Sequence, residues 1–497
     1  MAATAFAFVN LKLRLHTGPV NFRNLRALLL GLPLVIYCAL PTRNFYWDGV
    51  AFAIAIEKRQ PAASLFYPSH LLYMSWGSWL YGLATAAGIH TRALFAMQAA
   101  NGVLAGLSVI LFYRSLRQWG VPAGLGTAGA LVFAFSATWW KFAGDANAYV
   151  PAIFLLLCAN LLLANRRTTV LAGCAHAGAM LFHELAIFFL PAALPSLRKN
   201  RGLLAAYTAA AVVPVAIAYA AAHRAISRIS AVPRFFSWVT LHSPDSGFSF
   251  QPFANALLSL RGTLRLFFGG RVGDAADGGL SRAALLALAV AAVAFLVATW
   301  RAVRAIEVAS PPVSAVVWAG VYVAFLLFWM PQNTFYRLFY LPAAIAIALT
   351  MLRQAPRAAM AVGLFVPVLL LWNLAFAIYP QSRAESNAPY RFALAQTKRW
   401  PPGTPIAFHI FHPDLWTISY FNQQAAWIGM TDADTGLLER NLAEARNEGR
   451  TLWVEQTAYD LVESGSGGRQ WLAAHEDPAN LIEFHDAKHE FRFHCMR

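Results

Sequence analysis

Long apolar segments are the feature that most constrains how this chain can fold. A helix needs about 20 predominantly apolar residues to cross the hydrocarbon core of a bilayer. Because 58% of the 497 residues are apolar and only 12% are charged, a soluble globular protein and a disordered chain are both excluded. The chain is therefore predicted to be a polytopic α-helical membrane protein. The candidate segments are 25–41, 70–89, 94–113, 121–140, 148–164, 169–195, 203–222, 283–300, 313–330, 337–352 and 358–379.

Two of these segments do not fit a simple crossing. Segment 70–89 is rich in Trp and Tyr, as is a helix lying at the membrane surface, and segment 169–195 has His183-Glu184 at its middle. If 70–89 lies on the outer surface and 169–195 enters and returns at His183-Glu184, every short basic loop falls on one side. The positive-inside rule then predicts about 11 spans, a cytoplasmic N-terminus and an outer C-terminal region. The basic loops are the N-terminus, Arg114/Arg117, Arg166-Arg167, Arg198–Arg201, Arg301/Arg304 and Arg353/Arg357.

Acidic residues divide the chain into two parts. Of 23 Asp and Glu residues, eight lie before Tyr379 and 15 lie in the last 118 residues. Residues 1–379 are therefore predicted to form the membrane body and 380–497 a small outer α/β domain, in which apolar runs alternate with a helical pattern over Thr435–Arg450. The runs are Pro405–Phe411, Ala425–Met430, Thr451–Val454 and Leu481–Phe484.

The predicted topology also places most acids of the body on the outer side. Only Glu307 falls in a cytoplasmic loop, so any chemistry is expected to face outward, beside the first outer loop 42–69 and the long outer loop 223–282. The acids of the body are Asp48, Glu57, Asp145, Glu184, Asp245, Asp274, Asp277 and Glu307.

Asp48 is the strongest candidate for catalysis. It follows the first span within Phe45–Gly49, where neighbouring aromatic residues mark the membrane interface and leave a carboxylate desolvated but reachable. Such a group can act as a general base. The structural alternative is an acid in a solvated loop, or an N-cap of a helix over Val50–Lys58.

A second outer acid lies between two spans. Asp145 stands in the run Trp140–Tyr149, together with Lys141 and Tyr149. It can bind substrate, or simply cap the helix that follows.

His183 and Glu184 interrupt an apolar stretch. Ionisable residues at membrane depth are candidates for function because burying them is costly, and the alternative is a mutually satisfied pair between helices. No second histidine follows four residues later, which argues against a metalloprotease.

Arg337 begins a span at its outer end, after Tyr336, where positive-inside bias does not place an arginine. Phosphate binding would explain it because a guanidinium presents a rigid fork of donors, whereas the alternative is an arginine snorkelling at a helix end. His70, at the start of the interfacial segment 70–89, is a weaker candidate for binding the same phosphate.

Other classes of site are not supported. The body carries 28 of the 39 Lys and Arg residues, an excess typical of cytoplasmic loops and of anionic lipid or phosphate sites, and no basic surface interleaved with aromatic residues indicates nucleic acid. The four cysteines show no C-x-x-C spacing, so neither a disulfide framework nor a zinc site is indicated. No P-loop, G-x-G-x-x-G or Ser-His-Asp order is present.

Together these features resemble the GT-C superfamily of polytopic glycosyltransferases, in particular bacterial relatives of protein mannosyltransferases and of the aminoarabinose transferase that modifies lipid A. The motifs are an acid soon after the first span, a Pro-aromatic helix start, a basic turn, an outer acid-aromatic motif and a late Arg-aromatic-Leu-Pro motif. In this chain they match Asp48, Tyr67–Tyr73, Tyr113–Arg117, Asp145–Tyr149 and Arg337–Pro342.

The resemblance implies a sugar donor linked to a polyprenyl phosphate, with Asp48 as base and Arg337, His70, Lys141 or His183 at the phosphate. It implies a lipid, glycan or protein acceptor, membrane lipids around the body, and a place in the bacterial cytoplasmic membrane. Many members have paired acids in the first loop, whereas Trp47–Val50 offers one, so a divalent metal site is not favoured there and no other cofactor is indicated. A transporter or flippase of lipid-linked saccharides, and a catalytically idle assembly protein of this fold, are the alternatives.

Overall fold

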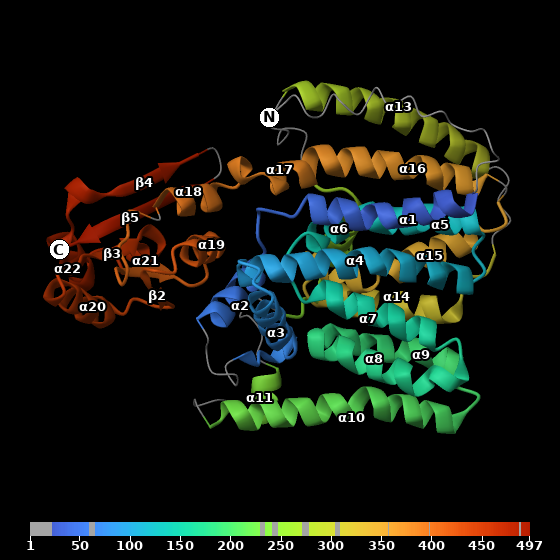
Figure 1. The fold of residues 1–497 in the computed structure, drawn as a ribbon, viewed down its shortest axis with the longest axis horizontal. Coiled ribbons are helices and arrows are strands. Elements are labelled where there is room, and N and C mark those ends of the chain that lie inside the picture. The colour runs from blue at the N-terminus through green and yellow to red at the C-terminus, as the bar shows by residue number, and fades with distance from the viewer. Residues whose placement is uncertain are drawn as a thin grey trace.

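The structure, a computed structural model, describes residues 22–58, 65–228, 234–240, 247–270, 278–303, 309–355, 357–396, 398–486 and 489–497. A bundle of roughly parallel and antiparallel helices forms the body, and a smaller domain with a β-sheet lies at one end of it (Figure 1). The predictions that concern the basic N-terminus, Asp245, Asp274, Asp277, Arg304 and Glu307 lie outside the described residues.

Each predicted apolar segment coincides with one or more helices of the body. The elements are α1 (Phe22–Ala39), α2 (Trp47–Glu57), η2 (Pro68–His70), α3 (Tyr73–Ala86), α4 (Ala93–Gln118), α5 (Ala123–Phe135), α6 (Ala137–Ala143), α7 (Tyr149–Leu162), η3 (Arg166–Thr168), α8 (Thr169–Phe182), η4 (Glu184–Phe189), α9 (Leu190–Leu197), α10 (Arg201–Ile226), α11 (Phe235–Val239), α12 (Pro252–Phe267), α13 (Gly278–Val303), α14 (Val313–Phe328), η6 (Phe335–Phe339), α15 (Leu341–Met351), α16 (Ala358–Asn373), η7 (Leu374–Ile378) and α17 (Tyr379–Ser382).

Three helical stretches of the described residues are long and apolar enough to cross a membrane by length and composition, namely 93–118, 201–226 and 358–382. Shorter apolar helices of 10–17 residues accompany them. The chain is thus a mostly helical, multi-pass membrane protein. The number of its membrane crossings stays a prediction.

Segment 169–195 is a helical hairpin that turns at His183. The α8 helix ends there in an extended residue, and η4 and α9 run back beside it. The return is fixed by His176 of α8, whose Nε2 donates to the carbonyl oxygen of Ala186 at 2.8 Å and whose Nδ1 bonds the hydroxyl of Tyr207 at 2.9 Å. The predicted entry and return at His183-Glu184 is therefore present in the fold.

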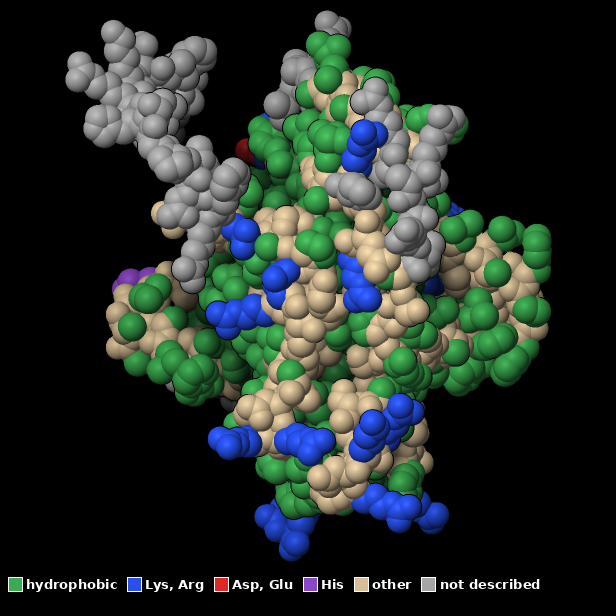
Figure 2. All heavy atoms as spheres, turned by 90° about the vertical axis from the view of Figure 1, so that its right-hand side faces the viewer, with side chains coloured by type: hydrophobic (Ala, Val, Ile, Leu, Met, Phe, Trp, Pro, Cys, Tyr) green, Lys and Arg blue, Asp and Glu red, His purple; other side chains and the backbone are tan. Residues whose placement is uncertain are grey.

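The two ends of the body differ in charge. The connections from α4 to α5, α7 to α8, α9 to α10 and α15 to α16 all lie at the end away from the sheet domain (Figure 1). Figure 2 faces this end and shows Lys and Arg side chains gathered on it. At the opposite end, α3 runs steeply across the bundle direction, beside α2 (Figure 1). The short basic loops of the described residues thus share one end, as the predicted topology requires, and α2 and α3 lie at the other.

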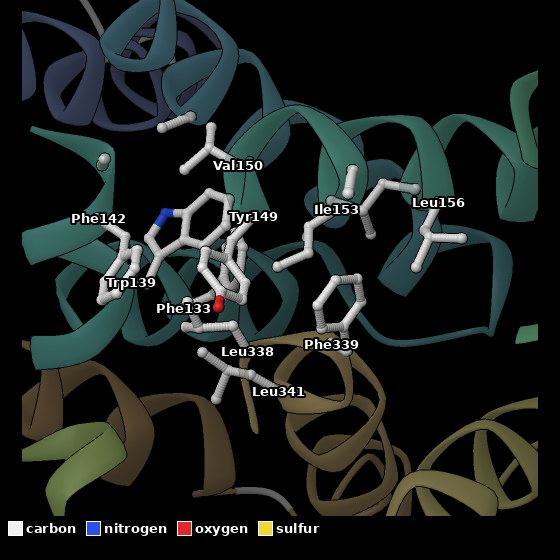
Figure 3. Close-up of a cluster of buried hydrophobic side chains, with 14 of the residues drawn as sticks. Phe133, Trp139, Phe142, Tyr149, Val150, Ile153, Leu156, Leu338, Phe339 and Leu341 are labelled. Carbon is white, nitrogen blue, oxygen red and sulfur yellow. The ribbon is translucent and has the colours of Figure 1, made fainter. Parts of the chain in front are cut away.

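Aromatic packing holds α7 in the centre of the body. The Tyr149 and Phe142 rings pack edge to face with centroids 5.2 Å apart, and the Phe133 and Trp139 rings lie 4.3 Å apart. Leu338, Phe339 and Leu341 close this cluster from the side of η6 and α15 (Figure 3). The result is a densely packed core next to the outer ends of several helices.

Two predicted spans are interrupted near this core. Segment 121–140 breaks at Ser136, which adopts an extended conformation between α5 and α6. Segment 337–352 starts with the 3₁₀ turn η6, and its α-helix begins only at Leu341, where Pro342 occupies the first turn. The predicted long loop 223–282 contains the helices α11 and α12 and the start of α13 in its described parts.

The C-terminal domain is a small α/β unit. Its five-stranded sheet has the order β2-β1-β3-β5-β4, in which β1 pairs parallel with β2 and β3, and β5 pairs antiparallel with β3 and β4. Four strands coincide with the predicted apolar runs, and β5 was not predicted. The elements are α18 (Ala388–Gln396), β1 (Pro405–His409), α19 (Pro413–Phe421), β2 (Ala426–Met430), α20 (Thr435–Asn447), β3 (Leu452–Glu455), α21 (Gln456–Leu461), α22 (Gly467–His475), β4 (Ile482–His485) and β5 (Glu490–Met496).

Candidate active site

Asp48 lies in the first turn of α2, at the end of the body nearest the C-terminal domain. The helix begins at Trp47, and its N-cap, Tyr46, makes no side-chain capping bond. Asp48 therefore does not cap the helix, and the helix starts earlier than the capping interpretation required. A carboxylate in the first turn is favoured by the helix dipole, but burial raises the pKa of Asp48 to about 7, an effect that a hydrogen bond with Tyr46 partly opposes. Such a group can take up a proton near neutral pH.

Aromatic side chains from four separate segments surround Asp48. The ring of Tyr149 lies 6.2 Å from that of Tyr46 and 6.1 Å from that of Tyr336. The charge of Asp48 contributes to raising the pKa values of Tyr46, Tyr336 and Tyr67, after burial, and the carboxylate also forms a hydrogen bond with Tyr46. We refer to Tyr46, Tyr67, Tyr149 and Tyr336, with His70 and His183, as the aromatic cluster.

Two buried histidines complete the cluster. The rings of His70 and His183 lie 4.6 Å apart, and His183 lies 4.6 Å from Tyr149. His70 Nδ1 donates to the carbonyl oxygen of Phe182 at 3.3 Å. His183 Nδ1 accepts from the backbone N–H of Leu185 at 3.2 Å, which places its proton on Nε2, and this buried Nε2 has no partner in the described part of the chain. A hydrogen-bond donor without an acceptor is thus held inside the cluster.

Glu184 connects the cluster with a large apolar cavity. The carboxylate bonds the side chain of Ser69, and its charge adds to that of Asp48 in raising the pKa of Tyr67. His183 and Glu184 are therefore not a mutually satisfied pair. Glu184 also lines a cavity of about 570 Å³ between α8, η4, α10, α11 and α14, whose other walls are almost entirely apolar. Trp329 lines the same cavity and stacks on Tyr336 with ring centroids 5.0 Å apart, so cavity and cluster share a wall.

Asp145 lies behind Asp48 and holds the first outer loop in place. Its buried carboxylate accepts the backbone N–H of Tyr46 at 2.8 Å and that of Ala146 at 2.8 Å. Burial raises its pKa to about 7, and the nearby ammonium of Lys141 opposes that rise. Asp145 thus fixes the residue before α2. It does not cap α7, because Asn147 Oδ1 performs that role by accepting from Tyr149 and Val150.

Arg337 is buried but faces away from the aromatic cluster. Its terminal nitrogens donate to the Tyr340 hydroxyl at 3.0 Å and to the Pro331 carbonyl oxygen at 2.6 Å, and its guanidinium packs on Gly262 of α12. Its Nε has no partner, and no carboxylate of the described residues forms an ion pair with it. The alternative interpretation, an arginine snorkelling at a helix end, does not fit this burial, since the side chain is only 2% exposed.

The donor set around Asp48 does not fit a divalent metal. No group of three or more His, Cys, Asp or Glu side chains is placed to hold an ion within the described ranges. Asp48 bonds the hydroxyl of Tyr46, whereas a hard cation is usually held by several carboxylate or carbonyl oxygens.

The structure thus brings together Asp48, His70, Tyr149, His183, Glu184 and Tyr336, places Asp145 and Lys141 directly behind them, and leaves Arg337 on another side of η6. Sequence reasoning missed Tyr46, Tyr67 and Ser69. The signal for these three residues was their position beside Asp48 and His70, since a residue next to a candidate in an irregular segment often shares its site.

Comparisons with known proteins agree on the fold. Neither a family model nor a curated protein matches the sequence. The structure is similar to ArnT from Cupriavidus metallidurans bound to undecaprenyl phosphate, with a TM-score of 0.58 and 11% identity over 96% of this chain and 98% of that chain. It is also similar to the apo state of the same ArnT, with a TM-score of 0.50 and 13% identity over 95% of this chain and 98% of that chain. The chain therefore has the GT-C fold, as the resemblance in the sequence predicted.

Proposed function

We propose that this GT-C-fold protein is an inverting glycosyltransferase, which moves a sugar from a polyprenyl-phosphate donor to a lipid, glycan or protein acceptor on the outer face of the membrane. The observation that carries the proposal is that the aromatic cluster around Asp48 adjoins an apolar cavity of about 570 Å³, which is lined by Glu184 and by Trp329, the residue that stacks on Tyr336. A desolvated carboxylate beside a space for a lipid chain is the arrangement that transfer from a lipid-linked donor needs. The fold neighbour ArnT was solved with undecaprenyl phosphate bound, which supports a donor of this class.

In the proposed reaction Asp48 is the base. The acceptor hydroxyl oxygen attacks the anomeric carbon from the face opposite the phosphate, and Asp48 takes the hydroxyl proton as the new C–O bond forms. The bond between the anomeric carbon and the phosphate oxygen breaks, and its electron pair leaves with the polyprenyl phosphate. The configuration at the anomeric carbon is inverted.

Positive and donor groups offset the charge that grows on the leaving phosphate. The free Nε2–H of His183 is the donor that lies inside the cluster, and His70 supports its position. Arg337 directly follows Tyr336, but its guanidinium packs on Gly262 on another side of η6, so a role at the phosphate requires the side chain to turn toward the cluster when the donor binds. Burying the charge of an arginine that has no carboxylate partner costs free energy, unless a bound anion pairs with it.

The remaining parts of the proposal concern substrates and place. The tyrosines of the cluster and Glu184 would contact the sugar, and the cavity between α10 and α14 would hold the first isoprene units of the lipid. The body would lie in the bacterial cytoplasmic membrane with the C-terminal domain outside, because the short basic loops share the opposite end.

Asp48→Asn tests the proposal. The amide keeps size and hydrogen bonding but cannot take a proton near neutral pH, so transfer should fall by ~10²–10⁴-fold while donor binding persists. The assay is sugar transfer from a synthetic polyprenyl-phosphate sugar in liposomes, with donor binding measured separately. Asp145→Asn is the matched control, because its remaining oxygen can still accept the Tyr46 N–H, and a smaller loss is expected.

Near-normal transfer by the Asp48 variant would show that Asp48 is not the general base. Loss of donor binding alone would make Asp48 a ligand of the substrate. Movement of the intact donor across the bilayer without any transfer would favour the flippase alternative.

A further inference from the structure

Glu57 ends the helix that carries Asp48, and its carboxylate lies between the body and the C-terminal domain. We propose that Glu57 is a positioning residue, which fixes α2 against the C-terminal domain so that this domain sets the place of Asp48. The inference rests on the proposed role of Asp48 as the base, but it concerns a different end of the helix and a different part of the protein.

The Glu57 carboxylate accepts hydrogen bonds from four residues in two segments of the chain. From the body, Arg92 donates through Nε at 2.9 Å and the backbone N–H of Ala93 donates at 2.7 Å. From the C-terminal domain, the Tyr420 hydroxyl donates at 2.6 Å and Gln423 Nε2 at 3.3 Å. The Glu57 side chain is only 9% exposed, so these bonds are protected from water. Hydrogen bonds to a charged carboxylate are stronger than those between neutral groups, and here they join the body to the C-terminal domain.

The same carboxylate completes the start of α4, one of the longest helices of the body. The N-cap of α4 is Arg92, whose side chain makes no capping bond, and Glu57 accepts the first free N–H of the helix instead. An anion at a helix N-terminus is favoured by the dipole. The C-terminal end of α2 is therefore tied to a long helix of the bundle and to α19 at one point.

The other end of α2 is equally restrained. Asp145 holds the N–H of Tyr46, and Gly49 packs so closely on the carbonyl group of Ala146 that a side chain would not fit there. Just before the helix, the Phe45 ring packs on Tyr390 and Phe421 of the C-terminal domain, with centroids 5.6 and 5.7 Å away. The C-terminal domain thus touches the chain on both sides of the catalytic helix.

The geometry makes α2 a short rigid rod. Its 11 residues span ~16 Å at 1.5 Å per residue, and Glu57 lies nine residues after Asp48. A displacement of α19 is therefore passed along the helix to Asp48 rather than absorbed by a flexible loop. Because a misplacement of ~1 Å far from the chemistry can cost ~10²-fold in rate, a loosened junction should be seen in turnover.

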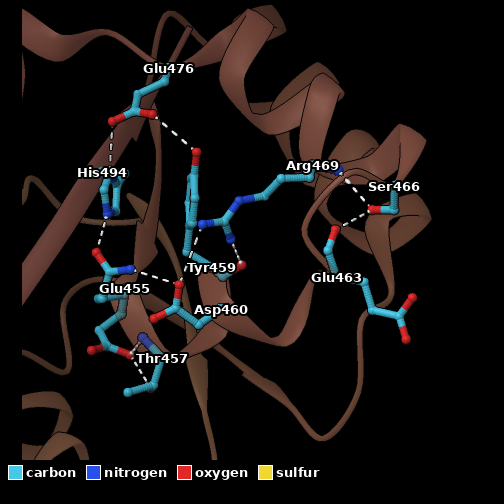
Figure 4. Close-up of polar contacts among 10 residues, drawn as sticks. Glu455, Thr457, Tyr459, Asp460, Glu463, Ser466, Arg469, Glu476 and His494 are labelled. Atoms are coloured by element: carbon cyan, nitrogen blue, oxygen red, sulfur yellow. Dashed lines mark hydrogen bonds and ion pairs between the residues drawn. The ribbon is translucent and has the colours of Figure 1, made fainter.

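The domain supplies a closely matched control for this junction. Tyr420 donates to Glu57 and carries the Arg92 guanidinium over its ring at 4.1 Å. Tyr459, within the C-terminal domain, donates to Glu476 at 3.2 Å and carries the Arg469 guanidinium over its ring at 4.0 Å (Figure 4). Each tyrosine thus bonds a glutamate and stacks under an arginine, but only the first joins the two parts.

The experiment compares Tyr420→Phe with Tyr459→Phe in the full chain in liposomes. Tyr420→Phe should lower kcat about tenfold and leave the donor KM within about twofold, since α2 shifts while the cavity is untouched. Amide hydrogen exchange over residues 47–57 should accelerate in the same variant. Tyr459→Phe should change neither kcat nor exchange in α2. Glu57→Gln should exceed Tyr420→Phe in both effects, because it weakens every bond at the junction.

Three outcomes overturn the inference: equal turnover in the two tyrosine variants, faster α2 exchange without a fall in kcat, or a fall in kcat without faster exchange. Asp48→Asn is assayed in parallel. Asp48→Asn could transfer sugar normally while Tyr420→Phe shows a lower kcat and faster amide exchange in α2. In that case Asp48 is not the base, but the role of the junction in placing α2 stands.

Discussion

In the C-terminal domain, His494 finds a protein acceptor for each ring nitrogen, whereas His183 in the body leaves one buried nitrogen without a partner. The Nδ1 of His494 bonds Glu476 at 2.7 Å and its Nε2 bonds Gln456 Oε1 at 2.8 Å (Figure 4). Gln456 in turn donates to Asp460 at 2.8 Å, and the Tyr459 ring stacks on the imidazole at 4.4 Å. Both histidines are buried and lie against a tyrosine ring, Tyr149 for His183 and Tyr459 for His494.

The two clusters differ in whether their polar groups are hydrogen-bonded to other residues of the protein. In the domain the polar groups of the His494 cluster bond one another, which leaves nothing for a ligand and indicates a structural role. In the body, the geometry of His183 holds an N–H in place and offers it no acceptor. Because an unmade buried hydrogen bond costs free energy, an oxygen of the proposed donor phosphate would stabilise this N–H by accepting from it.

The largest difference between the two clusters is expected when the histidine of each, His183 or His494, is replaced by asparagine. His183→Asn keeps a side chain that can cap η4 but removes the free Nε2–H, so kcat should fall by ~10²-fold with little change in thermal stability. His494→Asn leaves Glu476 and Gln456 without their partner, so the free energy of unfolding should fall by ~1–3 kcal/mol while turnover of the folded enzyme persists. Turnover in liposomes and thermal unfolding in detergent measure both quantities. The comparison fails if His183→Asn is active or if His494→Asn alone loses activity.

Much of the architecture could be read from the sequence because apolar length and charge are local signals. The eleven apolar segments coincide with helices, and His183-Glu184 marks the turn of the hairpin. Strand β5 was missed because the search was for continuous apolar runs, whereas its apolar residues Phe491, Phe493 and Cys495 alternate with the polar residues Glu490, Arg492 and His494.

The site could be predicted only in part, since its geometry depends on contacts between distant segments. Asp48 and His183 are more than 130 positions apart, and no local pattern shows that Tyr149 lies between them. The direction of a side chain is also not local: Tyr336 joins the cluster, while Arg337, the next residue, turns toward α12. Capping does not explain Asp145 because the side chain of Asn147, two residues later, accepts the first N–H groups of α7.

A smaller effect is expected when the buried Arg337 is compared with Arg469, which is 28% exposed. Arg337→Lys keeps the charge but loses the fork of donors, so kcat should fall about tenfold, or ~1.4 kcal/mol of transition-state stabilisation. Arg469→Lys serves as the control, because Arg469 already bonds the Tyr459 carbonyl oxygen at 2.6 Å within the domain. Its turnover should match that of the unsubstituted protein. Equal turnover of the two lysine variants would remove the phosphate-binding role of Arg337.

The smallest effect is a pH dependence that has opposite signs for turnover and stability. The pKa of Asp48 is raised to about 7, so the fraction of the base that is ionised, and with it kcat, should rise about fourfold from pH 6.5 to pH 8. Stability should change the other way. A carboxyl group whose folded pKa lies above its ordinary value of 3.8 binds protons more strongly when folded, so the free energy of unfolding falls as the pH rises from about 4 to about 7.

Asp145 has a pKa raised to about 7 as well, so it adds to the slope of stability but not to that of turnover. Asp48→Asn should therefore remove only its share of the slope in stability, while Asp145→Asn should leave the rise of kcat with pH in place. The kcat profile and the thermal midpoint are measured on the same samples between pH 5 and pH 8. A kcat profile that stays flat across neutrality would contradict titration of the base, because no other step assigned here needs a carboxylate to lose its proton.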